Sequence, residues 1–148
     1  MSREKTELLN RLIENGHEME VRVYYEDTDF SGVVYHSNYL RYMERSRTEW
    51  LRHLEIFHTD LEKDDSAFAI HRMSLKFGPP AVIDDLLIVR TVLQKLTGAR
   101  SFLRQEVLRK GKDGNETMLC GADVEVAFIN HGGGAKRFPD ELREKLGG

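Results

Sequence analysis

The sequence predicts an α+β fold in which an antiparallel sheet packs on one long helix. Two observations carry this prediction. Residues 38–54 repeat apolar side chains at helical spacing, and several other segments alternate apolar with polar residues, as strands do. The order along the chain is one strand, the long helix and then a run of strands, which is typical of the α+β class.

Before the helix, the chain has three regions. Residues 1–17 mix charge with a few leucines at a spacing that predicts a short amphipathic helix ending at Gly16. From Met19 to Tyr25 the pattern has period two, which indicates a half-buried strand. Residues 26–32 form a polar loop of turn-forming residues, after which helix-favouring sequence begins at about Asn38.

The helix pattern and the segments after it complete the predicted fold. Along residues 38–54 the expected apolar side is Leu40, Met43, Trp50, Leu51 and Leu54. Capping-box spacing between Thr59 and Glu62 predicts a short second helix near 60–65. Strands are expected at 72–77, 86–96, 101–109 and 122–128, with hairpin turns at Gly98 and 111–114 and a stop at Pro79-Pro80.

Length and composition restrict the class of protein. The 148 residues fit one domain, 1–148, with an N-terminal arm at 1–17 and a C-terminal tail at 132–148. The tail starts with Gly132 to Gly134, which predict a flexible segment. A net charge of -3 lacks the excess of basic residues that nucleic-acid binding requires, so nucleic acid is not an expected partner. We find no signal-peptide pattern and no apolar stretch long enough for a transmembrane segment, so we expect a cytoplasmic protein. The single cysteine, Cys120, is interpreted as a core residue.

The segment from Tyr25 to His36 carries the candidate chemistry. It brings Tyr25, Asp27, Asp29 and His36 to a strand-to-helix connection, with Gly32 allowing a sharp bend. Free N–H groups at a helix N-terminus suit the oxygen of an acyl carbonyl under attack. A carboxylate beside that carbonyl can attack it or activate water. The same residues also suit an ordinary turn and cap, so the pattern alone leaves both interpretations open.

A resemblance adds to this interpretation. Residues 21–39, VRVYYEDTDFSGVVYHSNY, and 42–49, YMERSRTE, resemble the signature of the hotdog-fold 4-hydroxybenzoyl-CoA thioesterase family. More narrowly, they resemble its Tol-Pal-associated branch of acyl-CoA thioesterases. The match is dense over residues 21–55 and compatible through about Asn130. Phe30-Ser31 departs from the small residues common in the family and could narrow the acyl pocket.

The resemblance implies a fold, a reaction and a site. The fold is a sheet wrapped around the helix, and the reaction is hydrolysis of acyl-CoA to a free acid and coenzyme A, with no cofactor beyond the coenzyme A of the substrate. Asp29 corresponds to the catalytic aspartate, nucleophile or general base, with His36 and Tyr25 beside it. The family pairs protomers with sites at the interface, which implies a homodimer or homotetramer.

Two other functions stay open. One is dehydration of a hydroxyacyl thioester, which needs a carboxylate base on the helix opposite a histidine. The other is a binding module for acyl carrier protein or a lipid-synthesis enzyme, with weak hydrolysis. The helix residues Glu44 and Glu49 are interpreted as solvated or ion-paired groups, and the spacing of His53 and His58 does not suggest a metal site.

Two groups of side chains have both a structural and a functional interpretation. The aromatic residues Tyr35, Tyr39 and Trp50 suit the core better than an acyl pocket. A basic hairpin could receive the phosphates of coenzyme A, although each of its residues is better interpreted as solvated. Its members are Arg100, Arg104, Arg109 and Lys110.

Overall fold

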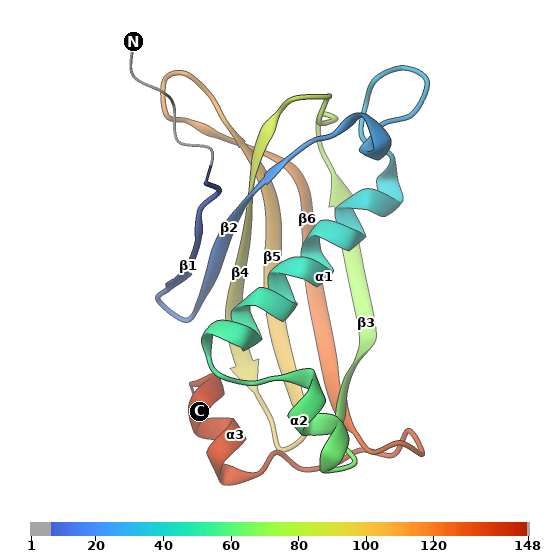
Figure 1. The fold of residues 1–148 in the computed structure, drawn as a ribbon, viewed down its shortest axis with the longest axis vertical. Helices are drawn as coiled ribbons and strands as arrows, with labels where there is room; N and C mark the ends of the chain where they lie inside the picture. Colours follow the sequence, from blue (N-terminus) through green and yellow to red (C-terminus); the bar gives the residue numbers. More distant parts are fainter. Residues whose placement is uncertain (1–6, 148) are drawn as a thin grey trace.

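A computed structural model describes residues 7–147 of the chain. These residues form six strands, three α-helices and one 3-10 helix, and a long helix followed by a run of strands agrees with the prediction (Figure 1). In chain order they are β1 (Asn10–Ile13), β2 (Gly16–Arg22), the 3-10 helix η1 (Tyr25–Asp27), α1 (His36–His53), α2 (His58–Lys63), β3 (Ala67–Phe77), β4 (Leu86–Leu96), β5 (Arg100–Lys110), β6 (Glu116–Ile129) and α3 (Asp140–Leu146).

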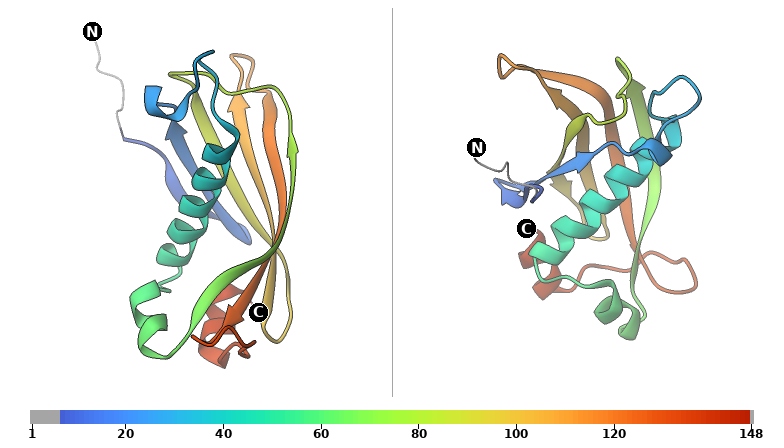
Figure 2. Two further views of the ribbon diagram at one scale, coloured as in Figure 1. Left: turned by 90° about the vertical axis from the view of Figure 1, so that its right-hand side faces the viewer. Right: turned by 45° about the horizontal axis from the view of Figure 1, so that its top comes forward.

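The strands form one antiparallel sheet, and α1 lies across one of its faces. The strand order is β1-β2-β4-β5-β6-β3, so β3 is paired on one side only, with β6. Figure 2 shows α1 running diagonally over the curved sheet, with α2 and α3 near the end of the sheet opposite the loop that precedes α1. The predicted α+β class is confirmed, and none of the helices in the described part of the chain is long and apolar enough to cross a bilayer.

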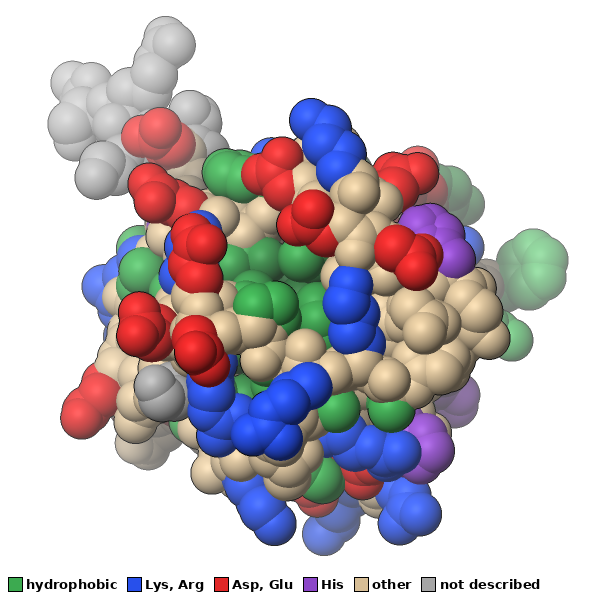
Figure 3. All heavy atoms as spheres, turned by 90° about the horizontal axis from the view of Figure 1, so that it is seen from below, with side chains coloured by type: hydrophobic (Ala, Val, Ile, Leu, Met, Phe, Trp, Pro, Cys, Tyr) green, Lys and Arg blue, Asp and Glu red, His purple; other side chains and the backbone are tan. Residues whose placement is uncertain are grey.

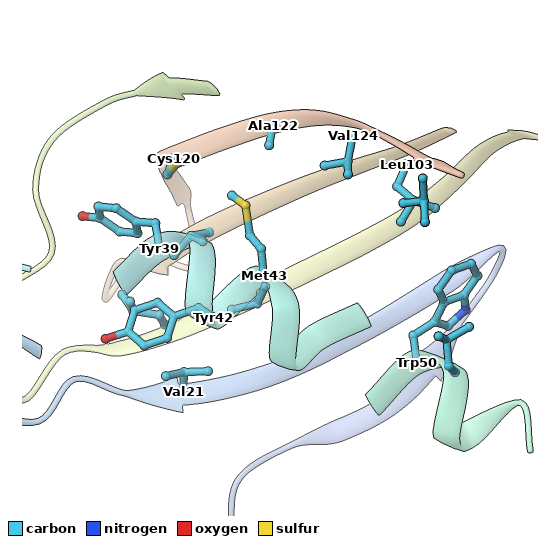
Figure 4. Packing of buried hydrophobic residues seen from close by; sticks show 14 of the residues in the cluster. Val21, Tyr39, Tyr42, Met43, Trp50, Leu103, Cys120, Ala122 and Val124 are labelled. Carbon is cyan, nitrogen blue, oxygen red and sulfur yellow. The ribbon is translucent and has the colours of Figure 1, made fainter. Parts of the chain in front are cut away.

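The long helix buries a different set of side chains from the predicted one. Met43, Trp50 and Leu51 are buried as expected, and Figure 4 shows Met43 and Trp50 among the core side chains. Leu40 is exposed, however, and the tyrosines Tyr39 and Tyr42 are buried in its place. Both rings belong to the hydrophobic core, where Tyr39 packs against Tyr42 and against Phe77 of β3. The preference for a core role of Tyr39 and Trp50 is therefore confirmed, whereas it is wrong for Tyr35, which is exposed.

A buried polar network joins α1 to the centre of the sheet. The side-chain amide of Gln105 on β5 donates to the backbone oxygen of Met43 at 3.0 Å and to the Thr91 hydroxyl at 2.9 Å. The hydroxyl groups of Thr91 and Ser46 are 2.8 Å apart. These groups are buried and hydrogen-bonded to each other, so they avoid the cost of burying unpaired polar atoms and fix the position of the helix on the sheet.

The predicted helix before Gly16 is wrong. The described part of this segment forms the hairpin of β1 and β2, and residues 1–6 lie outside the described residues. Asn15 turns the chain with φ at 58°, and Gly16 then pairs with Val92 of β4. Pairing with the sheet overrides the local helical pattern, as tertiary contacts often do.

The capping prediction for the second helix is also wrong in detail. Helix α2 begins at His58 with Phe57 as its N-cap, and no side-chain hydrogen bond caps it. Thr59 lies inside the helix rather than before it. The existence of a short helix in this region is confirmed, with its start two residues earlier than predicted.

The C-terminal tail packs near α2, at the end of the sheet opposite the loop that precedes α1. Asn130 and Gly133 close a turn through a hydrogen bond of 2.9 Å, and α3 follows with Leu142 and Leu146 buried. Viewed from this end, apolar side chains form the floor of a hollow with charged groups around it (Figure 3). The cavity between α2 and α3 has a volume of about 350 Å³.

The hairpin of β1 and β2 places a buried histidine against α1. His17 has no exposed surface, its Nε2 lies 2.6 Å from Asn10 Oδ1, and its Nδ1 has no partner within the described residues. Burial, and after it the nearby His53, lower the pKa of His17 from its ordinary value to about 4. The neutral ring is therefore the form that the fold accepts.

We expect acid to destabilise the protein through His17. Because the pKa falls from 6.5 in the unfolded chain to about 4 in the folded one, the stabilisation is complete above pH 6.5 and is lost as the pH falls towards 4. The loss should be on the order of 3 kcal/mol. Denaturant unfolding from pH 7 to 4 should show this slope in the wild type and not in His17→Gln. An unchanged slope in that variant would contradict the assignment.

Candidate active site

The loop between η1 and α1 is folded back on itself by backbone hydrogen bonds. The N–H of Asp29 donates to the Val33 oxygen at 2.9 Å, and the N–H of Gly32 donates to the Asp29 oxygen at 3.1 Å. Gly32 has φ at 81°, a conformation that side-chain-bearing residues rarely adopt. Val34 is tied to Ala81 by a further bond of 2.8 Å, so the loop is attached to the segment between β3 and β4.

One oxygen of the Asp29 carboxylate is held and the other is free of described partners. Oδ1 accepts hydrogen bonds from the Ser31 hydroxyl at 2.6 Å and from the Ser31 N–H at 2.8 Å. These bonds, the hydroxyl first, lower the pKa of Asp29 below its ordinary value. The group is therefore an anion at neutral pH. No hydrogen bond to Oδ2 occurs within residues 7–147.

The N-terminus of α1 presents unpaired amide groups next to this loop. Tyr35 is the N-cap, and its N–H donates to the Asp27 oxygen at 3.1 Å. The N–H groups of His36 and Ser37, the first two helical residues, have no backbone acceptor among the described residues. Together with the helix dipole they make this end of α1 favourable for a developing negative charge.

Asp29 and His36 line the same cavity. Its volume is about 160 Å³, and its floor comes from the end of β3 and from β6. The His36 ring packs on Phe77 with ring centroids 4.7 Å apart. The other lining residues are Val33, Val34, Tyr35, Tyr39, Gly78, Pro80 and Leu119. The cavity thus has a carboxylate and helix amides at one side and apolar side chains around the rest.

Tyr25 is not brought to this cavity. It lies on η1 with 80% of its surface exposed, and its backbone oxygen accepts hydrogen bonds from Thr28. Its role beside Asp29 stays a prediction. Phe30, expected to narrow the pocket, is fully exposed at the loop tip and does not line the cavity.

Two residues support the site through hydrogen bonds that the sequence pattern did not indicate. The Asn38 side chain is buried and donates to the Asp27 backbone oxygen at 2.7 Å. The Tyr39 hydroxyl accepts the N–H of Ala81 at 3.0 Å. Both bonds connect segments that surround Asp29. An asparagine in a first helical turn gives no sequence signal that separates this role from an ordinary cap.

The cysteine and the helix glutamates considered in the sequence analysis lie in environments that suit a structural role. Cys120 is buried, and burial raises the pKa of its thiol to about 11, as expected for a core residue. Glu49 pairs with Arg52 at 3.0 Å, and Glu44 is exposed.

The arginines of the basic hairpin are ion-paired. Arg100 pairs with Glu125, Arg104 with Asp123 and Glu106, and Arg109 with Asp85.

Comparison with known proteins assigns the family. The family model for the thioesterase-like superfamily matches residues 23–146. The chain is 41% identical over 122 residues to the acyl-CoA thioesterase YbgC of Haemophilus influenzae, covering 82% of this chain and 86% of the relative. It is 39% identical over 116 residues to the acyl-CoA thioesterase YbgC of Helicobacter pylori, covering 76% and 85%.

Solved structures agree with this assignment. The structure of a probable thioesterase from Bartonella henselae superposes with a TM-score of 0.75 at 42% identity, covering 84% of this chain and 99% of the other. The 4-hydroxybenzoyl CoA thioesterase from Pseudomonas sp. strain CBS-3 has a TM-score of 0.78 at 20% identity, covering 86% and 96%, and shares the fold alone. The hotdog fold expected from the resemblance is confirmed. The chain belongs to the thioesterase-like superfamily.

Proposed function

We propose that the chain hydrolyses acyl-CoA thioesters to a free carboxylic acid and coenzyme A. The observation that carries the proposal is one cavity lined by Asp29 and His36, beside a helix N-terminus where the amides of His36 and Ser37 have no backbone acceptor among the described residues. The relatives named as acyl-CoA thioesterases, at up to 41% identity over most of the chain, support the same reaction.

The mechanism assigns one role to each group. The substrate carbonyl oxygen accepts hydrogen bonds from the amides of His36 and Ser37, which stabilise it as it becomes negative. Asp29 supplies the attack through its unoccupied Oδ2. Each contribution is worth about 100-fold or more in rate, so the two together can support catalysis without a metal.

Two routes are consistent with this placement. In the first, Asp29 removes a proton from water, the oxygen of that water bonds to the carbonyl carbon, and the carbon–sulfur bond breaks to release the thiol. In the second, the carboxylate itself bonds to the carbonyl carbon and displaces the thiolate, and water then hydrolyses the mixed anhydride.

Thiol release from a panel of short, long and aromatic acyl-CoAs tests the proposal. Turnover above the spontaneous rate on at least one of them is the expected outcome. The acyl carrier protein thioesters of the same acyl groups belong in the panel, because acyl carrier protein is the partner of the alternative, weakly hydrolytic function. Absence of turnover on every thioester would overturn the proposed reaction.

We predict that Asn38→Ala lowers kcat/KM by about 10- to 100-fold, because the bond to the Asp27 oxygen holds the entry to the Asp29 loop and small displacements of catalytic groups are costly. Unfolding should become easier by only about 1 kcal/mol. Steady-state kinetics and denaturant unfolding measure the two effects. Asn115→Ala, the same change in the exposed turn between β5 and β6, is the matched control; equal kinetics in both variants would contradict a positioning role for Asn38.

We further propose that two copies pair through β3. This strand is 11 residues long, lies at the sheet edge and exposes Ile70 and Phe77 there. Unpaired long edges are open to strand pairing, and antiparallel pairing of two β3 strands would use the free hydrogen-bonding groups. Because Phe77 lines the cavity and Asp29 is fully exposed in the single chain, the second copy would also shield the site from water.

Light scattering tests the pairing. We predict a mass of twice the chain's 17.1 kDa, or four times in a dimer of dimers. Ile70→Lys should shift the population towards the single chain, because a buried unpaired charge at the edge opposes pairing. Leu8→Lys is the control, because Leu8 is exposed next to β1 at the opposite edge of the sheet, and it should leave the mass unchanged. A wild-type mass of one chain at micromolar concentration would contradict the pairing.

We place the protein in the cytoplasm as part of the proposed function. Coenzyme A thioesters are its expected substrates, and the free thiol of Cys120 agrees with a reducing compartment.

A further inference from the structure

A second cavity lies along the C-terminal half of α1, between the helix and strands β3, β5 and β6. Its volume is about 160 Å³. Arg47, which lines it, follows His36 by three turns of helix, or roughly 16 Å at ~1.5 Å per residue, so this cavity is separate from the Asp29 site. Figure 4 shows Trp50 and Leu103 at this end, away from Tyr39. Its apolar walls are Trp50, Leu51, Phe68, Leu103, Val126 and Leu146.

The cationic side chain at this cavity is held in place by the core. Arg47 Nη1 donates to Gln105 Oε1 at 2.8 Å. The Gln105 amide is itself fixed, because its nitrogen donates to Met43 and Thr91 in the buried network under α1. The guanidinium is therefore pre-positioned by a rigid partner rather than left free in solvent.

Arg47 lacks an acidic partner in the described part of the chain. No carboxylate lies within ion-pair distance of it, although the exposed Glu44 one turn earlier favours its charge from farther away. Burial lowers the pKa of Arg47, which reflects the loss of water around the charge. A guanidinium has five N–H donors, and the Gln105 bond uses one of them. Within residues 7–147, the side chain thus has donors to offer an anion.

Two other cations of this protein have their acceptors built in. Arg90 pairs with Glu18 and Glu116. In the cavity between α2 and α3, Lys136 donates to the Asp64 oxygen and the Ser66 hydroxyl. These side chains are satisfied by the fold itself. Arg47 differs because its one hydrogen-bond acceptor among the described residues is a neutral amide oxygen, and the Glu44 carboxylate, which also lines this mainly apolar cavity, does not pair with it.

We propose that this cavity binds a carboxylic acid with a compact apolar body, its carboxylate on Arg47 and its body against Trp50. Planar carboxylates match the guanidinium fork and can pair with two of its N–H groups. An apolar cavity of roughly 150 Å³ holds a benzene ring, so the present volume suits a six-carbon body. The reaction proposed above releases such acids, and the link to a reaction product rests on that proposed function; the binding itself does not.

Trp50 gives a direct readout because it is the single tryptophan of the chain. We would titrate the wild type with cyclohexanecarboxylate and, separately, with cyclohexanecarboxamide, which has the same shape without the charge, and follow tryptophan fluorescence. The acid should bind at least about tenfold more tightly than the amide, because hydrogen bonds to charged groups are the stronger ones. Equal affinities, or no response to the acid, would overturn the proposal.

Substitutions locate the charge. Arg47→Met should weaken the acid by about 10- to 100-fold and leave the amide unchanged, whereas Arg45→Met, at an exposed position two residues away, should change neither. Full acid affinity in a folded Arg47→Met would contradict the site. Should circular dichroism show that this variant does not fold, the acid and amide comparison on the wild type decides alone. Asp29→Asn should bind the acid as wild type does, whether or not it hydrolyses thioesters, which separates this test from that of the proposed reaction.

Discussion

Asp29→Asn is expected to reduce kcat for acyl-CoA hydrolysis by about 1000-fold or more. The amide cannot take a proton from water and is a far poorer nucleophile than a carboxylate, so both proposed routes lose their attacking step. The residue is fully exposed, and an amide oxygen can still accept the two bonds from Ser31, so the fold and its free energy of unfolding should be unchanged. Thiol release and denaturant unfolding measure the two quantities.

A matched aspartate controls for the loss of charge. Asp60→Asn on α2 makes the same chemical change at an exposed position near the opposite end of the molecule and should retain wild-type turnover. Asp29→Asn with more than about a tenth of the wild-type kcat would remove Asp29 from the catalytic role. A rise in KM with an unchanged kcat would point to substrate binding instead of chemistry.

Oxygen-18 water distinguishes the two routes once the loss is established. If the carboxylate attacks directly and water then attacks the aspartyl carbon of the anhydride, label enters Asp29 and is detected by mass spectrometry of the peptide that contains it. If Asp29 activates water, label enters the product acid alone even after many turnovers. Label in Asp29 would therefore establish the covalent route.

The elements that the sequence predicted well are those whose environment is encoded locally. The long helix was expected at 38–54 and lies at His36–His53, and the strand expected at 86–96 is β4 with the same bounds. Asp29 and His36 meet in one cavity largely because only six residues lie between them and Gly32 bends the loop. Short-range patterns of this kind need no knowledge of the rest of the molecule.

The parts that were missed depend on contacts between distant segments. Phe77 and Leu119 reach the Asp29 cavity because β3 pairs with β6 over a register that one strand pattern cannot reveal. Leu40, expected on the apolar side of the helix, is exposed, whereas Tyr39, already preferred as a core residue, is buried with its hydroxyl bonded to the N–H of Ala81, 42 positions away along the chain. Helical periodicity alone is satisfied almost equally by either residue.

Gly16 shows most clearly how a distant contact overrides a local pattern. The sequence predicted that this glycine ends a helix, but the structure requires glycine there for a different reason. It pairs with Val92 of β4, and a Cβ added to it would lie 1.9 Å from the Thr91 backbone oxygen. The position needs glycine for close approach of two backbones, with no positive φ involved. Because a main-chain oxygen cannot move aside as a flexible side chain can, the hairpin must shift away from β4.

Gly16→Ala is therefore expected to lower the free energy of unfolding by about 4 kcal/mol or more, at the upper end for one substitution, because it also disturbs the adjacent buried His17. Denaturant unfolding at pH 7 measures the change. Gly98→Ala is the control, since its added Cβ would meet only the end of the Arg137 side chain, at 3.2 Å, and should cost little. If the two variants were equally stable, the approach of β2 to β4 at Gly16 could not be as close as the structure has it, and the glycine would need another explanation.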